Sequence, residues 1–109
     1  MNNTAYEPNI VALRITTAAN DAIVFNNIFT GRSDAVTDEV GTSTIDGSNI
    51  IQQLTDGLNF TSDFRLQPGS IAIDAGVSSF AGFNAPAEDL DGTARPQGSA
   101  VDVGAHELP

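Results

Sequence analysis

The chain has 109 residues and a net charge of −10, because fourteen acidic residues stand against four arginines and no lysine. Its length is that of one domain, residues 1–109, and its content of 40% hydrophobic residues favours a folded chain. No basic patch is available to replace counterions on phosphate, which argues against nucleic acid and anionic membranes as partners. The lack of cysteine excludes disulfides and thiolate sites.

Targeting signals are not evident in this sequence. No hydrophobic run approaches membrane-spanning length, and residues 1–8 lack the basic start and the apolar core of a signal peptide. We therefore expect no membrane-spanning segment, and the residues by themselves assign no localisation.

The residue types predict an all-β fold. Ile, Val, Phe and Thr recur, glycines and prolines punctuate the chain, and windows with charged residues at helical spacing are almost absent. Residues 10–16 alternate between apolar and polar positions, as expected for a strand with one buried face. Residues 22–29 are the most apolar segment, and the pair Asn26 and Asn27 predicts a tight bend between two short strands, because Asn tolerates left-handed backbone.

A weak internal repeat follows. Residues 21–29 align with residues 43–51 after a shift of 22 residues and without a gap. A repeat of this length, with short strands and Asn at a bend, is typical of a β-solenoid coil, although two copies do not exclude coincidence. We expect residues 31–41 to form an acidic surface loop and residues 1–9 a polar lead-in or an edge. The aligned pairs are Ile23 with Ile45, Asn27 with Asn49, Ile28 with Ile50, and Phe29 with Ile51.

The second half is organised around residues 63–76. Apolar residues occupy alternate positions on both sides of a Pro68-Gly69 break, which predicts two strands joined by a turn. Residues 101–107 repeat the pattern and predict a last strand. Residues 77–98 form a long connection with little strand signal, and its phenylalanines, Phe80 and Phe83, predict a cover that packs over a core.

Five phrases of the second half carry a resemblance: Phe64-Arg-Leu66, Ser70-Ile-Ala-Ile-Asp-Ala-Gly76, Asp89-Leu-Asp-Gly92, Arg95-Pro96 and Val101-Asp-Val-Gly-Ala-His-Glu107. Together, over residues 60–107, they resemble the C-terminal end of right-handed parallel β-helix repeat proteins of the bacterial choice-of-anchor and polysaccharide-lyase-like type. The resemblance departs at Ile71, where proline is usual, and at His106, where an aromatic residue is usual. Those families are mostly secreted or held at the cell surface.

The resemblance and the repeat together predict a short right-handed parallel β-helix with a C-terminal capping loop. Residues 10–54 would form its coils and residues 55–109 the last coil and cap. A small β-sandwich is the alternative. The catalytic faces of lyase-like relatives lie on earlier coils, so the resemblance implies no catalytic residues here.

Asp89, Asp91 and Gly92 resemble the opening of a calcium loop, in which alternate carboxylates wrap a hard cation. No other cofactor is suggested. The preferred interpretation is structural: Asp-Gly makes a turn, and Asp89 or Asp91 pairs with Arg95.

Other polar residues are interpreted in the same way. Asp74 and Asp102 each precede a glycine by two positions and are expected to accept hydrogen bonds from backbone amides, with an acid–base pair as the alternative. His106 is a candidate base or ligand, but a packing role is preferred. The arginines could neutralise an acidic sugar, yet Arg65 and Arg95 lie in strand and turn phrases; the other two are Arg14 and Arg32.

We therefore expect a non-catalytic structural or interaction module, the terminal cap of a β-helix, that forms a homodimer through the open end of its first coil, residues 10–15 and 22–29. The alternative is a fragment of a carbohydrate-active or carbohydrate-binding protein of the polysaccharide-lyase type, with a polysaccharide partner. A glycan-binding face would show exposed aromatic residues beside acidic clusters, whereas a cap need not.

Overall fold

The computed structural model describes residues 1–6, 11–16, 21–31, 36–39, 41, 43–53 and 55–109. These residues form short β-strands, and none belongs to a helix that is long and apolar enough to cross a membrane. The strands are β1 (Thr4–Tyr6), β2 (Leu13–Ile15), β3 (Ile23–Val24), β4 (Ile28–Thr30), β5 (Val36–Asp38), β6 (Thr44–Ile45), β7 (Ile50–Gln52), β8 (Ser79–Phe80) and β9 (Phe83–Asn84).

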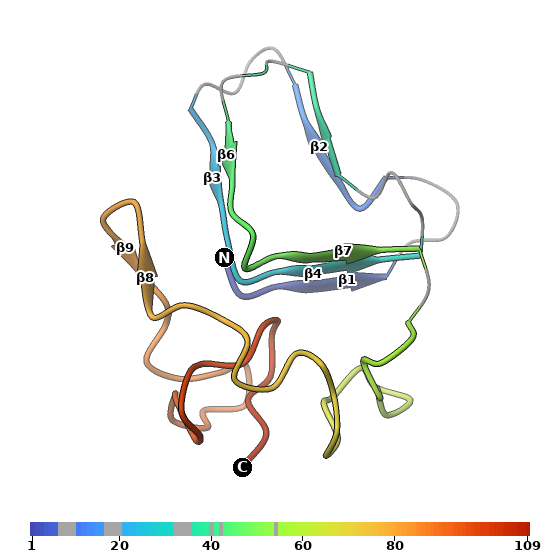
Figure 1. Ribbon diagram of the computed structural model, residues 1–109, viewed down its shortest axis with the longest axis vertical. Coiled ribbons are helices and arrows are strands. Elements are labelled where there is room, and N and C mark those ends of the chain that lie inside the picture. Colours follow the sequence, from blue (N-terminus) through green and yellow to red (C-terminus); the bar gives the residue numbers. More distant parts are fainter. Residues whose placement is uncertain (7–10, 17–20, 32–35, 40, 42, 54) are drawn as a thin grey trace.

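Three of the four sheets are parallel. Their strand orders are β1-β4-β7, β2-β5 and β3-β6, and each strand pairs with a strand that lies 21 to 24 residues away in the sequence. Figure 1 shows these sheets on three sides of one interior, with residues 55–109 beyond the sheet β1-β4-β7. The predicted all-β character is confirmed.

The predicted right-handed parallel β-helix is wrong, because the described strands form separate small sheets and no closed solenoid. The parallel sheets contain only two or three strands each. After β7 the chain adds no further strand to them, because β8 and β9, the strands of residues 55–109, pair only with each other. The alternative β-sandwich is not formed either. Among the described residues, antiparallel pairing is confined to β8-β9 and to a bridge between Glu88 and Ala94.

The internal repeat nevertheless predicted most of the register. Ile28 pairs with Ile50 and Phe29 with Ile51, as the shift of 22 residues predicts. Ile23, however, pairs with Thr44 and not with Ile45. The second copy has one more residue in the bend between its two strands, so the register moves by one position there.

A ladder of asparagine side chains runs beside these strands. The Oδ1 of Asn27 accepts hydrogen bonds from the backbone N–H and the Nδ2 of Asn3, at 2.9 and 3.0 Å. The Oδ1 of Asn49 accepts the same two bonds from Asn27, at 3.0 and 2.9 Å. Residues 1–6 thus contain the edge strand β1, and Asn3 adds a third position to the ladder that the sequence repeat did not indicate.

β4 separates two apolar clusters because its side chains alternate between the faces of the sheet. Phe29 packs with Ile15 and Val24 in the interior between the parallel sheets. Ile28 points the other way, toward the second half of the chain. Burial of each such side chain contributes about 1.5–3 kcal/mol. The second cluster contains Ile28, Leu58, Leu66, Ala72 and Val103.

Turns replace the strands that were predicted in the second half. Phe64 and Asp74 both have positive φ angles, 61° and 54°, which interrupt an extended strand across residues 63–76. Ile71 is 50% exposed, so the apolar alternation does not define one buried face. Residues 101–103 are buried but form no strand.

Two further predictions about connections were incomplete. The loop expected over residues 31–41 contains β5. The connection 77–98 contains the β8-β9 hairpin, whose turn residues Ala81 and Gly82 both have positive φ, as a two-residue type I′ turn requires. Phe80 does pack against Phe25, with ring centroids 5.9 Å apart, but Phe83 is 51% exposed.

Candidate functional site

An aromatic cluster joins the two halves of the chain at the surface. The rings of Tyr6 and Phe64 are stacked with centroids 5.8 Å apart, and the rings of Phe60 and Phe64 meet edge to face with centroids 5.5 Å apart. Tyr6 is 47% exposed and Phe64 is 40% exposed. We call these three residues the aromatic cluster. Exposed aromatic residues that gather in this way mark binding surfaces.

A tight loop, residues 61–65, positions Phe64. The backbone N–H of Thr61 donates to the carbonyl of Arg65 at 2.9 Å, and the Thr61 hydroxyl accepts from the N–H of Arg65 at 3.0 Å. Phe64 adopts left-handed backbone within this loop, a conformation that is costly for a bulky residue. The loop therefore holds the ring against Tyr6, the last residue of the edge strand β1.

Two clefts lie on either side of Tyr6 and Phe64. Their volumes are about 570 and 630 Å³. Both are wide and shallow enough to accept part of an extended ligand, and both combine apolar and polar walls. Besides the two shared rings, the first is lined mainly by Ala5, Ala12, Asp63, Leu90 and His106, and the second by Gln53, Asp56, Asn59 and Phe60.

A charged network supports the wall of the first cleft. Arg65 donates from Nε to Asp63 at 2.8 Å and from Nη1 and Nη2 to the two carboxylate oxygens of Asp91. The Nδ1 of His106 lies 3.1 Å from Asp91 Oδ2. Hydrogen bonds from Arg65 lower the pKa of Asp91, and those from Thr61 and then Arg65 lower the pKa of Asp63. Both carboxylates are therefore ionised at neutral pH.

Asp89 is the centre of a turn. Its Oδ1 accepts hydrogen bonds from the backbone N–H groups of Asp91 and Thr93, each at 2.8 Å, and its Oδ2 accepts from that of Glu107 at 2.8 Å. Burial raises the pKa of Asp89, but these three N–H donors outweigh it and the net pKa is lowered. The Asp89 carboxylate thus accepts hydrogen bonds from three backbone N–H groups that would otherwise need an acceptor on a neighbouring strand.

The structure brings His106 to the two aspartates that were predicted as calcium ligands. One ligand atom from each of Asp89, Asp91 and His106 lies within 4.8 Å of the others. An imidazole and two carboxylates supply few of the six to eight oxygen atoms that calcium prefers, and Arg65 already occupies both oxygens of Asp91. These three residues alone do not supply the shell that calcium prefers, and nothing in the structure tests whether calcium binds here, so calcium binding stays a prediction.

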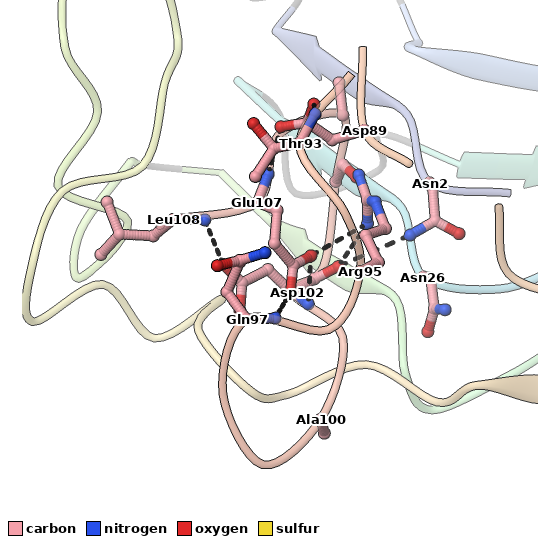
Figure 2. Close-up of polar contacts among 12 residues, drawn as sticks. Asn2, Asn26, Asp89, Thr93, Arg95, Gln97, Ala100, Asp102, Glu107 and Leu108 are labelled. Atoms are coloured by element: carbon pink, nitrogen blue, oxygen red, sulfur yellow. Dashed lines mark hydrogen bonds and ion pairs between the residues drawn. The ribbon is translucent and has the colours of Figure 1, made fainter. Parts of the chain in front are cut away.

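Arg95 lies in a second, buried network, which Figure 2 shows. It donates to the carbonyls of Asp102 and Gly104 at 3.0 and 2.9 Å, and its Nη1 lies 3.5 Å from a carboxylate oxygen of Glu107. The side chains of Arg95 and Glu107 are 1% and 0% exposed. Burial is the main cause that raises the pKa of Glu107. The predicted pair between Arg95 and a turn aspartate is replaced by this ion pair.

Asp74 and Asp102 bind backbone amides, as predicted. Asp102 accepts from the N–H groups of Asp74 and Leu108, both at 2.8 Å, and Asp74 accepts from that of Ala100 at 3.0 Å. Asp102 is only 2% exposed. A buried carboxylate with both oxygens occupied is suited to holding the chain and not to acid–base chemistry on a ligand.

The remaining arginines are placed as follows. Arg14 pairs with Glu39 on the surface, with Nε 2.8 Å from Oε1. Arg32 lies outside the described residues. Arg65 is bound by two carboxylates, so each of the three arginines that the structure describes has its charge compensated by at least one carboxylate.

The aromatic cluster was not found by sequence reasoning. The sequence pattern predicts a lead-in or an edge for residues 1–9, which include Tyr6, and a strand for the segment that contains Phe64. No local pattern connects residues so far apart in the chain; only a correct placement of β1 at the sheet edge would have brought them together. Comparison of the chain with protein-family models, curated proteins and solved structures finds no match.

Proposed function

We propose that this chain is a non-catalytic interaction module that binds a neutral polysaccharide at the aromatic cluster. The observation that carries the proposal is the exposed, stacked pair of Tyr6 and Phe64 between two clefts. The C–H face of a sugar ring packs on an aromatic face, and polar groups around the ring fix its hydroxyls. Asp63, Asn59 and Gln53 supply such groups on the two sides.

The charges favour a neutral ligand over an acidic one. The only arginine beside the cluster, among the described residues, is Arg65, and Asp63 and Asp91 already compensate its charge. The chain as a whole has a net charge of −10, which repels a polyanion. The same pairing supports binding without catalysis, because β-elimination on an acidic sugar needs a cation that is free to neutralise the carboxylate.

The resemblance of residues 60–107 to choice-of-anchor and polysaccharide-lyase-like proteins supports a polysaccharide as the ligand, and the preference for a neutral one is argued from the charges alone. This support is an analogy between sequences and carries no residue roles. The site itself is inferred from the exposed rings of Tyr6 and Phe64.

Affinity electrophoresis in gels that contain a neutral glucan or, separately, a polyuronate tests the proposal. We expect the neutral polysaccharide to retard the protein and the polyuronate not to. The variants Y6A and F64A should lose the retardation, whereas F83A, which removes an exposed aromatic ring on the β8-β9 hairpin, should keep it. Absence of retardation by neutral glucan, mannan and xylan, or equal loss in F83A, would overturn the proposal.

A further inference from the structure

Three Asp-Gly pairs occur in the sequence, and they begin at Asp46, Asp56 and Asp91. In such a pair the main-chain nitrogen of the glycine can attack the side-chain carboxyl carbon of the aspartate, because glycine carries no side chain that obstructs the approach. The attack needs a carboxyl group in its protonated form and a nitrogen that is not held in a hydrogen bond. The structure gives the three pairs different surroundings.

The pair at Asp91 is held on both sides. Arg65 donates hydrogen bonds to both carboxylate oxygens of Asp91 and lowers its pKa. The N–H of Gly92 donates to the carbonyl of Asp89 at 3.1 Å. An ionised carboxylate does not lose a hydroxyl group as water, and the nitrogen would have to give up its hydrogen bond before it could attack. We therefore expect this pair to react slowly.

The pair at Asp46 is held through its carboxylate. The Oδ2 atom of Asp46 accepts a hydrogen bond from the backbone N–H of Ser48 at 3.0 Å. The Ser48 hydroxyl, followed by this N–H, lowers the pKa of Asp46 and so keeps the carboxyl ionised. The N–H of Gly47 also points to this carboxylate, so that its hydrogen atom, and not its nitrogen, faces the carboxyl group. This pair is protected as well.

Asp56 lacks these restraints. Its side chain is exposed, and within the described part of the chain no hydrogen bond or ion pair reaches its carboxylate. Gln52 donates to the backbone carbonyl of Asp56, at 2.9 Å. The N–H of Gly57 has no acceptor among the described residues either. Both reacting groups of this pair are therefore available.

The turn at Asp56 requires the glycine that makes the pair reactive. The N–H of Leu58 donates to the carbonyl of Thr55 at 3.1 Å, so Asp56 and Gly57 are the two central residues of the turn. Gly57 has a φ of 76°, as the third residue of a type II turn requires. A Cβ atom at this position would also lie 3.0 Å from Cγ2 of Ile71. A side chain that would slow the attack is thus excluded by the fold.

We propose that Asp56 and Gly57 are a site of spontaneous isoaspartate formation in the folded chain. The nitrogen of Gly57 forms a bond to Cγ of the protonated Asp56 carboxyl, and the bond from Cγ to the hydroxyl oxygen breaks. The hydroxyl leaves with the N–H proton as water, which closes a five-membered imide. Water then adds to the main-chain carbonyl of the imide and breaks its bond to the nitrogen. The nitrogen stays on Cγ, and the main-chain carbon becomes a free carboxylate.

The product has one additional methylene group in the main chain, at the turn that leads to Leu58. Leu58 is fully buried in the cluster that contains Ile28. The carbonyl of Gly57 accepts a hydrogen bond from the N–H of Ile71 at 2.8 Å, which the longer turn displaces. We therefore expect the isomerised chain to unfold at a lower urea concentration than the original one. The proposal does not depend on the proposed polysaccharide site, because it needs no ligand other than water.

Incubation of the folded chain in mildly acidic buffer, followed by digestion and electron-transfer mass spectrometry of the peptides, tests the proposal. We expect isoaspartate to accumulate several-fold faster at Asp56 than at Asp46 or Asp91. In the urea-unfolded chain the three pairs should react at similar rates, because the hydrogen bonds that distinguish them are lost. A rate at Asp56 of the folded chain that is no higher than at both other pairs would overturn the proposal.

Two variants test the cause of the protection. Ser48→Ala should accelerate the reaction at Asp46, and Arg65→Ala should accelerate it at Asp91, while the rate at Asp56 should stay that of the wild type. Folded variants without these increases would show that the hydrogen bonds do not select the site, and would overturn the proposal. If a variant fails to fold, the comparison of the three pairs in the unmodified chain decides.

Two substitutions at Asp56 test the chemistry. Asp56→Asn should give the same isoaspartate faster, because ammonia leaves in place of water. Asp56→Glu should give none, because its ring would have six atoms and closes far less readily. Isomerised product at this position in Asp56→Glu would overturn the proposed imide.

Discussion

Residues 1–53 and residues 55–109 satisfy their backbone in different ways. In the first region parallel strands pair at a spacing of 21 to 24 residues, and an asparagine ladder ties the bends together. In the second region strands are almost absent, and the carboxylates of Asp89, Asp102 and Glu107 accept backbone N–H groups instead. Acidic side chains thus take over the role of neighbouring strands.

This difference explains where the acidic residues are needed. A buried N–H group without an acceptor lowers the free energy of unfolding by about 1–3 kcal/mol. A carboxylate that accepts from two such groups therefore stabilises the local backbone strongly. The amide side chains of the first region do not titrate, whereas the carboxylates of the second do. The comparison predicts that the two regions respond differently to mutation and to acid.

The largest effect is expected for Asp102→Ala. The substitution leaves the N–H groups of Asp74 and Leu108 without their acceptor at a position that is 2% exposed. We expect a loss of about 3 kcal/mol or more in the free energy of unfolding, measured by urea denaturation. Asp74→Ala, at an exposed carboxylate that accepts a hydrogen bond from the N–H of Ala100, should cost clearly less; equal losses would contradict the role of buried carboxylates.

An intermediate effect is expected for Asn27→Ala, which breaks the ladder in the first region. The side chain is buried and bonds to Asn3 and to Asn49. We expect a loss of about 2 kcal/mol in the free energy of unfolding that is the same at pH 7 and pH 5. Asn84→Ala, at an exposed position of β9, is the matched control and should change the free energy little.

The smallest effect is expected in the acid range and involves Asp89. Its pKa is lower in the folded chain than the ordinary value of about 3.9, so its stabilisation is present above that value and is lost as the pH falls through the folded pKa. The pKa of Glu107 is raised, so its contribution has the opposite sign and is lost as the pH rises. Asp89→Asn should therefore reduce the dependence of stability on pH below about 4.

Urea denaturation between pH 3 and pH 7 measures this slope. At pH 7 the variant should lose about 1 kcal/mol, because one acceptor oxygen becomes an amide. Glu88→Gln, at the exposed neighbouring position, is the control and should keep the wild-type slope. A wild-type slope in Asp89→Asn would show that Asp89 does not cause the acid sensitivity.

Sequence reasoning succeeded where a pattern was local. The shift that aligns Asn27 with Asn49 fixed the register of β4 and β7, and the Asp-x-Asp-Gly phrase indicated the turn at Asp89. It failed where left-handed residues interrupt an apolar alternation, as Phe64 does. Nor does any pattern connect Arg65 to Asp91 and His106, since these contacts depend on how two turns pack and not on spacing.

The alternation of side chains along β4 has a consequence for how the chain folds. Ile28 belongs to the cluster formed with the second half, and Phe29 to the interior of the first half. Cleavage between residues 53 and 55 would leave Ile28 facing water on one fragment and Leu58, Leu66 and Val103 on the other. Because β4 contributes side chains to both hydrophobic cores, neither half is an autonomous unit. The two halves should unfold in a single cooperative transition.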